Sequence, residues 1–556
     1  MKLKMFTVLT LAGTVALSGC SSAKPGASSN SATPNATAQS APTKLVWFSD
    51  ASFWNPPSPW NTDPNSVEGT ITQKTGLTFD FNIPAQDGGT KLSLMLATSE
   101  KLPDIVTVTD GTLVKKLIDS GKVWNMEEFL KKYDPSSTLL ANFPHDMKQA
   151  LIARDGGWFA FPSHMNSTDA REIYPASSEF YSDAAKFRNN NAVIFNEQIM
   201  KQAGISVSDI KTEDDLLAAF KKVKELKVNG APVIPLLVHG KNYQVATLPT
   251  LQDHFGAMEV DKAGNYRDKI FAPETKHVLD FMFKAAQEGY FDPGQMTLDD
   301  NGISAAASTG RVFCFIGGTP ATKFSEGING LTWVSPGPIL SNQNTKPVAG
   351  RNLKTTTGWM QTLISKTAAN PERIAKWLDY MTSNEGLLLN YYGFEGKGYN
   401  LNNGLVAQTE LGVQEAKDYS KTGVFAFWPF HNTAWHDHAT EAPKNRVGPD
   451  ALMAMQVGTA AAKKSTIYDT SALAMPSDFI PAGSKMANDQ VQIDQYKLAQ
   501  ISKIILAKDA NAMNQFYNDM ISKLKQLGLS DIDAKKNEQF HKQEKDFGIT
   551  VVGVNS

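Results

Sequence analysis

Residues 77–83 read Leu-Thr-Phe-Asp-Phe-Asn-Ile, so large apolar side chains alternate with mostly polar ones. An alternation of period two is typical of a β-strand that buries one face. Shorter apolar stretches flank it in the sequence, Leu45-Val-Trp-Phe48 before it and Asp104-Ile-Val-Thr-Val108 after it, and we expect both to be strands. Three strands therefore open the folded part of the chain.

Two helical segments separate these strands. Asp63-Pro64 has the residue types of a helix N-cap and first helical position, and Gly76 suits the end of that helix. Residues 91–97 are expected to form the second helix. The order strand, helix, strand, helix, strand predicts an α/β fold with parallel strands and right-handed crossovers.

A second set of strand and helix signals follows further along the chain. Val193-Ile-Phe195 and residues 233–238 are apolar enough for buried strands. Thr212 with Asp215 resembles a capping box at the start of a helix. Because 556 residues are too many for a single hydrophobic core, we expect at least two large lobes.

Two later helices are marked by apolar residues at helical spacing. One begins at Asn370-Pro371-Glu372. Near the end of the chain an apolar stripe runs from Met513 to Leu527, and Gly528 suits its C-cap. These stripes predict helices that pack on a core, with extra helices at the C-terminal end.

Composition excludes several classes of protein. A net charge of −2 and a pI near 6.5 lack the basic excess that nucleic-acid binders show. The chain has only two cysteines, so a disulfide framework is excluded. Cys314 lies in the apolar stretch Arg311–Ile316, which is typical of a buried strand, and we expect a core residue there, not a nucleophile.

The N-terminus has the order of a lipoprotein signal. Lys2 and Lys4 precede an apolar run over residues 6–16, which is shorter than the about 20 residues that cross a bilayer. Leu17-Ser-Gly-Cys20 then resembles the bacterial lipobox, in which the cysteine takes a lipid. The alternative is an ordinary secretory signal with a chance cysteine. Residues 21–43 are rich in Ser, Ala, Pro, Asn and Thr, and we expect a disordered tether.

Several further segments together resemble one family, the family 1 extracellular solute-binding proteins, in particular the large LplA-like and alginate-oligosaccharide-binding-like lipoproteins. The matching segments are Ile71-Thr-Gln-Lys-Thr-Gly-Leu77, Lys101-Leu-Pro-Asp-Ile105, Gly121-Lys-Val-Trp-Asn-Met126, Asp155-Gly-Gly-Trp-Phe-Ala-Phe-Pro162, Phe195-Asn-Glu-Gln-Ile-Met-Lys-Gln-Ala-Gly204, Pro371-Glu-Arg-Ile-Ala-Lys-Trp-Leu-Asp379, Tyr391-Tyr-Gly-Phe-Glu-Gly396 and Lys525-Gln-Leu-Gly-Leu529. They cover nearly the whole mature chain in the expected order.

The resemblance implies a two-lobed, periplasmic-binding-protein-like fold of the class II type, with a hinge between the lobes. It implies a carbohydrate ligand, with an oligosaccharide favoured over a monosaccharide. Its implied partners are ABC permease subunits in the membrane and the lipid bilayer, to which acylated Cys20 would anchor the protein. We expect a monomer on the extracytoplasmic side that needs no cofactor.

The expected division of the chain follows the same resemblance. Residues 1–20 are expected to be the signal peptide and lipobox, and residues 21–43 the tether. The first part of lobe 1 is expected at residues 44–162 and the first part of lobe 2 at residues 163–300. Residues 301–355 are expected to return to lobe 1, and residues 356–556 to return to lobe 2 and form the C-terminal helices.

No metal site is expected. Many relatives carry an Asp- and Asn-rich calcium loop, but the corresponding residues 227–232 offer only Asn229 as a side-chain oxygen ligand, whereas Ca²⁺ takes 6–8 oxygens. His431, His436, Asp437 and His438 lack the spacing of a recognised zinc motif.

Two aromatic stretches are candidates for sugar contact, because a sugar needs flat aromatic platforms beside polar side chains. One follows the first strand and holds Asp50, Trp54 and Trp60; the other holds Trp428 and Trp435. Both carry prolines and read as loops, and the alternative is that their rings only fasten the loops to the core.

Four more residues complete the candidate set. Trp158 is expected in the first hinge crossing, and Trp359 at a return to the second lobe. Arg188 suits vicinal hydroxyls or carboxylates, and a surface ion pair is its alternative role. Glu395 either accepts a ligand hydrogen bond or fixes its loop.

Two other functions compete with solute capture. A lipid-anchored glycan hydrolase would need two carboxylates about 5–9.5 Å apart across a cleft, and no short segment singles out such a pair. The G-x-S-x-G, H-E-x-x-H and P-loop motifs are absent from the sequence. A surface lipoprotein without a transport role is the other alternative.

Overall fold

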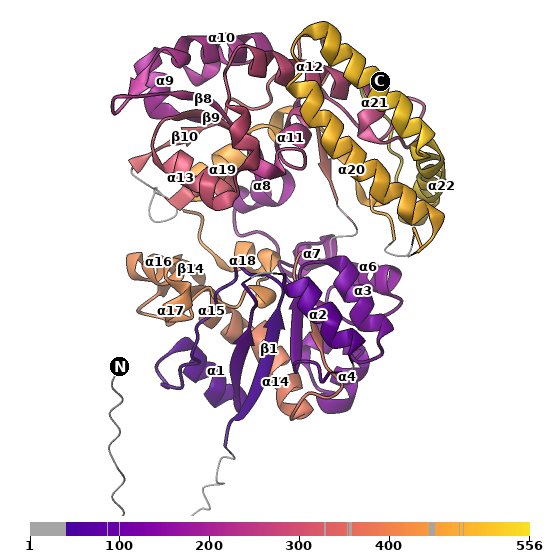
Figure 1. Ribbon diagram of the computed structural model, residues 1–556. Coiled ribbons are helices and arrows are strands. Elements are labelled where there is room, and N and C mark those ends of the chain that lie inside the picture. The colour runs from indigo at the N-terminus through magenta and orange to yellow at the C-terminus, as the bar shows by residue number, and fades with distance from the viewer. Residues whose placement is uncertain are drawn as a thin grey trace, which may run out of the picture. The chain divides into compact units, whose positions relative to one another are not determined.

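The computed structural model describes residues 41–85, 87–98, 100–326, 330–352, 354, 358–443, 451–476, 479–481 and 483–556. Cys20 and most of the predicted tether lie outside these residues. Residues 42–556 form a mixed α/β fold with two lobes, each built on its own sheet (Figure 1). The α/β prediction is therefore confirmed.

The sheet of lobe 1 has the strand order β2-β1-β3-β12-β4. β1 pairs in parallel with both β2 and β3, as the sequence predicted, while β12 runs antiparallel to β3 and to β4. The strands are β1 (Thr43–Ser49), β2 (Leu77–Asn82), β3 (Ile105–Val108), β4 (Phe161–Pro162) and β12 (Gln361–Ile364).

The first helix of lobe 1 begins later than predicted. Asp63 lies in a turn whose carbonyl oxygen accepts from the Ser66 amide, and Ser66 is the N-cap, accepting from the Gly69 amide at 3.0 Å. The predicted end at Gly76, in the left-handed conformation, is confirmed. The helices of this lobe are α1 (Val67–Thr75), α2 (Gly88–Ala97), α3 (Gly111–Asp119), α4 (Met126–Tyr133), α5 (Thr138–Asn142), α6 (His145–Asp155), α14 (Pro371–Thr382), α15 (Asn384–Tyr392), α16 (Glu410–Lys417) and α17 (Tyr419–Thr422).

The sheet of lobe 2 has the order β10-β5-β9-β8, with β8 parallel to β9 and β5 antiparallel to β9. Its strands are β5 (Asn191–Asn196), β8 (Ile234–Val238), β9 (Val312–Gly318) and β10 (Trp333–Val334). Its helices include α9 (Glu197–Ala203), α10 (Glu213–Lys224), α11 (Thr247–Phe255), α12 (Pro273–Gln287), α13 (Asp300–Ser308) and α19 (Ala451–Ala460). The predicted capping box of Thr212 and Asp215 is confirmed at the start of α10.

The two returns of the chain differ from the expected division. The expected division places residues 301–355 in lobe 1, yet β9 and β10 join the sheet of lobe 2. It places residues 356–556 in lobe 2, yet β12 joins the sheet of lobe 1, and α14 packs its Trp377 on that core. The physical reason is that a uniformly apolar strand such as Val312–Gly318 carries no signal for which sheet it enters.

Three long helices end the chain and cover lobe 2: α20 (Lys485–Ile505), α21 (Ala510–Gln526) and α22 (Leu529–Phe547). Figure 1 shows them packed beside one another. The predicted apolar stripe buries Met513, Met520 and Leu524 in the core of lobe 2, and Gly528 separates α21 from α22 in the left-handed conformation. The extra C-terminal helices are therefore confirmed.

Short elements connect the two lobes or extend them. They are α7 (Thr168–Ile173), α8 (Glu179–Phe187), α18 (Thr433–Ala439), the parallel pair β11 (Val348–Arg351) and β15 (Thr466–Asp469), and the hairpins β6 (Lys227–Val228) with β7 (Ala231–Pro232) and β13 (Tyr399–Asn402) with β14 (Leu405–Gln408). Among the described residues, no helix combines the length and the apolar character needed to cross a membrane.

Candidate functional site

One edge of the lobe 1 sheet gathers several candidate residues. The carboxyl ends of β1, β3 and β4 and the amino end of β12 meet there, because β12 runs antiparallel to its neighbours. Asp50 and Phe53 follow β1, His164 follows β4, and Trp359 precedes β12. Open α/β sheets bind their ligands outside the carboxyl ends of their strands.

Three aromatic side chains from distant segments meet at this edge, and we call Phe53, Trp359 and Trp428 the edge patch. The rings of Phe53 and Trp359 are stacked at 6.1 Å with planes 15° apart. Trp428, in the 3₁₀ turn Trp428–Phe430, lies 6.3 Å from Phe53 and 6.4 Å from Trp359. Phe53 is 60% exposed and Trp359 is 39% exposed, so the patch offers apolar ring faces to solvent.

Local backbone geometry holds Trp359 in place. Gly358 has a positive φ, and a β-carbon added to it would lie 2.0 Å from the carbonyl oxygen of Ser163, so only glycine fits so close to β4. The Trp359 indole then donates to Nδ1 of His164 at 2.9 Å. Burial lowers the pKa of His164 to about 4, so the ring is neutral at neutral pH. With its single proton on Nε2, the ring accepts this bond at Nδ1.

Asp50 is positioned at the same edge by β3. Its carboxylate accepts from the Thr109 amide at 2.9 Å and from the Thr109 hydroxyl. Burial raises the pKa of Asp50, and the Thr109 hydrogen bonds oppose that shift. The carboxylate is half-buried and directed to the loop after β3, so it is a fixed polar group at the same edge of the sheet.

Ring contacts continue from the edge patch into the protein through His164 and the buried His431. The ring of His164 lies 5.1 Å from His431, which in turn stacks on Tyr391 at 4.7 Å. Phe425 is 36% exposed, has a φ of 65° and lies 4.3 Å from His431. The result is a continuous row of rings across this edge of lobe 1.

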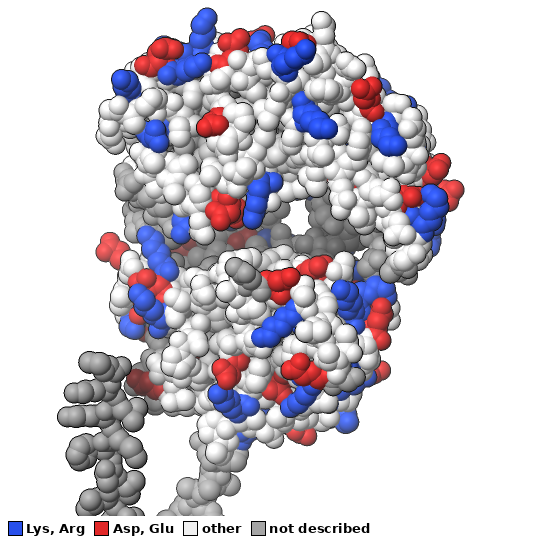
Figure 2. Space-filling view, in the orientation of Figure 1, with Lys and Arg blue, Asp and Glu red and all other residues white. Residues whose placement is uncertain are grey.

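Lobe 2 presents a matching strand edge with different chemistry. The carboxyl ends of β8 and β9 meet the amino end of β5, where Arg188 is exposed at the end of α8. His239 is buried there, and its Nδ1 accepts from the Gly318 amide at 2.8 Å. Figure 2 shows a hollow between the two lobes. Arg188 lies just before the amino end of β5, and its role in binding stays a prediction.

Three of the predicted contact residues are core residues instead. Trp54 is fully buried, with its indole donating to the Ala426 carbonyl at 2.8 Å, and Trp158 is buried and stacked on Phe143 at 4.4 Å. Trp435 is 2% exposed and donates to Asn384. Because the ring faces of these three are covered by protein, we withdraw a ligand contact for them. Trp60 is partly buried, packs against the core and donates to Thr72.

Two further predicted residues are Trp359 and Glu395. Trp359 leads into the sheet of lobe 1 and not into lobe 2, since β12 pairs with β3. Glu395 is exposed in the turn before β13, where its backbone pairs with Tyr399.

The histidines near α18 serve separate partners. His436 contacts Asp437 at 3.0 Å, Asp437 pairs with Arg171, and His438 contacts the Pro175 carbonyl. Across the part of the chain that the structure describes, no group of three or more His, Cys, Asp or Glu is arranged to hold a metal ion. Residues 227–232 form a tight hairpin turned by Asn229 and Gly230, both with positive φ.

Sequence reasoning missed Phe53, His164 and Phe425 as site residues. His164 has a positive φ and stands beside Trp359 only because β4 and β12 pair. A positive φ at a residue other than glycine leaves no clear mark in a sequence. Phe425 lies in the second aromatic stretch, so its residue type was the available signal.

Comparisons with known proteins agree with this architecture. The family described as bacterial extracellular solute-binding protein matches residues 71–387, which is more than half of the chain. No curated protein matches the sequence.

Solved structures share the fold at low sequence identity. The Streptococcus pneumoniae ABC-transporter substrate-binding protein FusA in complex with kestose is similar with a TM-score of 0.64 and 15% identity, over 91% of this chain and 100% of that chain. An HMO-binding, ABC-transporter-associated solute-binding protein from Bifidobacterium longum infantis has a TM-score of 0.61 and 13% identity, over 90% and 99%. The N-glycan transport solute-binding protein NgtS from Streptococcus pneumoniae has a TM-score of 0.54 and 16% identity, over 91% and 99%. With its two α/β lobes and the family match over residues 71–387, the chain belongs to the bacterial extracellular solute-binding proteins.

Proposed function

We propose that this protein captures an oligosaccharide outside the cytoplasm and delivers it, unchanged, to the permease of an ABC importer. The observation that carries the proposal is the edge patch of Phe53, Trp359 and Trp428 at the carboxyl edge of the lobe 1 sheet. Sugar rings have apolar C–H faces that stack on exposed aromatic rings. Asp50, at the same edge of the sheet, supplies a polar partner for hydroxyl groups.

The similar proteins support a carbohydrate as the ligand. FusA is described in complex with kestose, the Bifidobacterium protein as HMO-binding, and NgtS as an N-glycan transport protein. Each of these ligands is an oligosaccharide or glycan. The edge patch gives this chain its own physical basis for the same class of ligand.

Capture would proceed by closure of the two lobes around the sugar. The edge patch belongs to lobe 1 and Arg188 to lobe 2, so a ligand that touches both favours the closed arrangement. Such closure is a hinge motion about the connecting segments. A guanidinium donates well to vicinal hydroxyls, which gives Arg188 a role in the closed state.

A screen of purified protein against neutral and acidic oligosaccharides tests the proposal. We expect a rise in the melting temperature with at least one oligosaccharide, and recovery of that sugar with its mass unchanged. Trp359→Ala should abolish most of the rise. Shortening of the sugar would identify a hydrolase instead, and the lack of any response across sugars and peptides would favour a surface lipoprotein without a transport role.

We also propose that acylated Cys20 keeps the receptor near its permease. Lipid chains contribute about 0.8 kcal/mol per buried CH₂, so several chains on one cysteine anchor a protein firmly. Cys20→Ser should move the protein from the membrane fraction to the soluble fraction of the producing cell without changing sugar affinity. Retention of this variant on membranes would contradict the anchor.

A further inference from the structure

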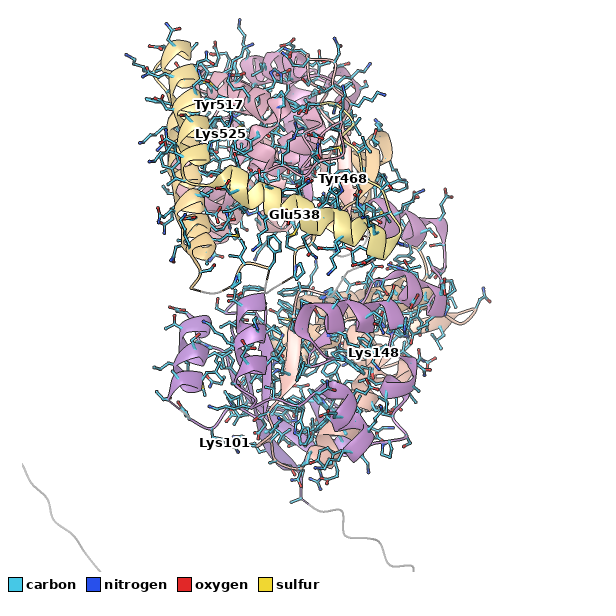
Figure 3. The ribbon with its side chains drawn as sticks, turned by 90° about the vertical axis from the view of Figure 1, so that its right-hand side faces the viewer. Lys101, Lys148, Tyr468, Tyr517, Lys525 and Glu538 are labelled. Atoms are coloured by element: carbon cyan, nitrogen blue, oxygen red, sulfur yellow. The ribbon has the colours of Figure 1, made fainter. Side chains whose placement is uncertain are left out.

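A second pocket lies in the C-terminal helical layer of lobe 2. It has a volume of about 520 Å³ and lies between the loop at Asn265, the 3₁₀ turn at Phe271, and helices α21 and α22. Figure 3 labels Tyr517 and Lys525 along α21 and Glu538 on α22. All its lining residues come from lobe 2 and the C-terminal helices, so the pocket is separate from the edge patch.

The pocket contains a carboxylate with unused hydrogen-bonding capacity. Asp533 lines it and is only 7% exposed. Its Oδ2 accepts from the Asp268 amide at 2.9 Å, while its Oδ1 is buried and has no hydrogen-bond partner among the described residues. A buried carboxylate oxygen without a partner carries a desolvation cost, so a donor that reaches it is strongly favoured.

The other lining residues suit a polar ligand with apolar faces. Tyr266, Phe271 and Tyr517 provide aromatic rings, and Asn265, Asn518 and Asn537 provide amides. The side-chain oxygen of Asn537 already accepts from the Tyr266 amide at 2.7 Å, which fixes that amide group at the wall. Aromatic rings beside amides and one carboxylate are the groups that a sugar requires.

Charge restricts the ligand further. Lys525 lines the pocket with its ammonium 5.8 Å from the Phe271 ring, and the Lys536 ammonium lies 5.6 Å from the Tyr266 ring, so cations accompany the Asp533 carboxylate. Asp268, which is next to Asp533, is paired with Lys497 at 2.7 Å. Asp533 would repel an anionic ligand and Lys525 would repel a cationic one. The charges of both signs on the pocket wall therefore favour a neutral ligand.

We propose that this pocket is a second, independent binding site for a neutral sugar unit, whose hydroxyl donates to Asp533 while its C–H face packs on Tyr517. The site goes beyond the proposed transport function, because it uses no residue of the edge patch. It would hold a part of a glycan at the outer surface of lobe 2.

The test uses the purified protein labelled with 3-fluorotyrosine and observed by ¹⁹F NMR. The resonances of Tyr266, Tyr517 and Tyr419 are assigned by Tyr→Phe substitutions; Tyr419 lies 5.3 Å from Trp428 and reports on the edge patch. Glucose, galactose, mannose and N-acetylglucosamine are the neutral probes, and glucosamine and glucuronate are the charged ones. We expect saturable shifts of Tyr266 and Tyr517 with at least one neutral sugar in the millimolar range.

Asp533→Asn should weaken this binding by roughly tenfold, since a bond to a charged acceptor is lost. The variant keeps an oxygen for the Asp268 amide, so the helix contact survives. Asp531→Asn is the matched control, because it makes the same charge change at an exposed position of α22, and it should leave the affinity unchanged. Tyr517→Leu, read through Tyr266, provides a second variant should Asp533→Asn fold poorly.

Four outcomes would overturn the inference: no saturable shift at Tyr266 or Tyr517 with neutral sugars, a response only to the charged probes, equal binding by Asp533→Asn, or, should that variant fold poorly, equal binding by Tyr517→Leu. A response at Tyr419 alone would reject the second site and leave the proposed function standing. Responses at Tyr266 and Tyr517 without any at Tyr419 would support the second site whether or not the edge patch binds.

Discussion

At the scale of single residues, tryptophans that look alike in the sequence divide into two physical classes. Trp54 is buried with its indole bonded to the Ala426 carbonyl, whereas Trp359 keeps an exposed face in the edge patch. Substitution by alanine should therefore affect stability at Trp54 and ligand binding at Trp359.

Trp54→Ala should lower the free energy of unfolding by about 3–5 kcal/mol, because a large core side chain leaves a cavity. Trp359→Ala should leave stability nearly unchanged and weaken sugar binding by roughly tenfold, since one stacking platform is lost. Urea unfolding and calorimetric titration of both variants measure the two effects. Loss of affinity in a stable Trp54→Ala protein would contradict the assignment of Trp54 to the core.

His164 links the edge patch to pH. Its Nδ1 can accept from the Trp359 indole only while unprotonated, and burial lowers the pKa of His164 from 6.5 to about 4. Since the folded pKa is depressed, the neutral ring stabilises the fold above pH 6.5, and this contribution is lost as pH falls from 6.5 to about 4.

The fluorescence of Trp359, taken as the difference between the wild type and Trp359→Phe, should therefore change with a midpoint near pH 4. His164→Asn, which suits the positive φ at this position, should remove the transition. A midpoint near 6.5 would mean that His164 is solvated, and the proposed support of Trp359 would be wrong.

At the scale of elements, an ion pair joins α7 to α18 where the chain connects the lobes. Arg171 and Asp437 meet at 2.8 Å with side chains 18% and 7% exposed. The Asp437 carbonyl also accepts from the Ser177 amide, which ties the following segment to α18. A pair this deep is costly to break because the remaining charge stays buried.

Asp437→Asn should lower the free energy of unfolding by about 3 kcal/mol, since Arg171 is left without its counter-charge. Asp119→Asn is the control: it removes an exposed pair with Lys115 and should change stability by less than about 0.5 kcal/mol. Chemical denaturation of both variants provides the comparison. Equal stabilities would show that the α7–α18 pair is solvated.

The local elements were predictable because their signals are local. The capping box of Thr212 and Asp215, the period of residues 77–83 and the left-handed Gly76 each depend on a few neighbouring residues. The sheet that receives β9 or β12 depends on pairing across more than a hundred residues, and Val312–Gly318 is buried on both faces. The prediction of the candidate site was wrong in part because burial also depends on contacts between distant segments. The same residue type, tryptophan, is a core residue at Trp54 and is exposed at Trp359.

At the scale of the whole molecule, two lobes have separate sheets and separate cores, and each sheet presents an edge where strands end. In the proposed function, lobe 1 contributes the edge patch and Asp50 to the ligand, and lobe 2 contributes Arg188. Charges of both signs are interspersed on the face that Figure 2 shows, so that face carries no single-sign field that would select the ligand.

Calorimetric titration with the oligosaccharide found by the screen tests this central claim most directly, when the sugar is recovered afterwards and its mass is measured. The account predicts one high-affinity site in the wild type, binding weakened by roughly tenfold in Trp359→Ala, and an unchanged sugar. Equal affinity of Trp359→Ala and the wild type, or a shortened sugar, would contradict it.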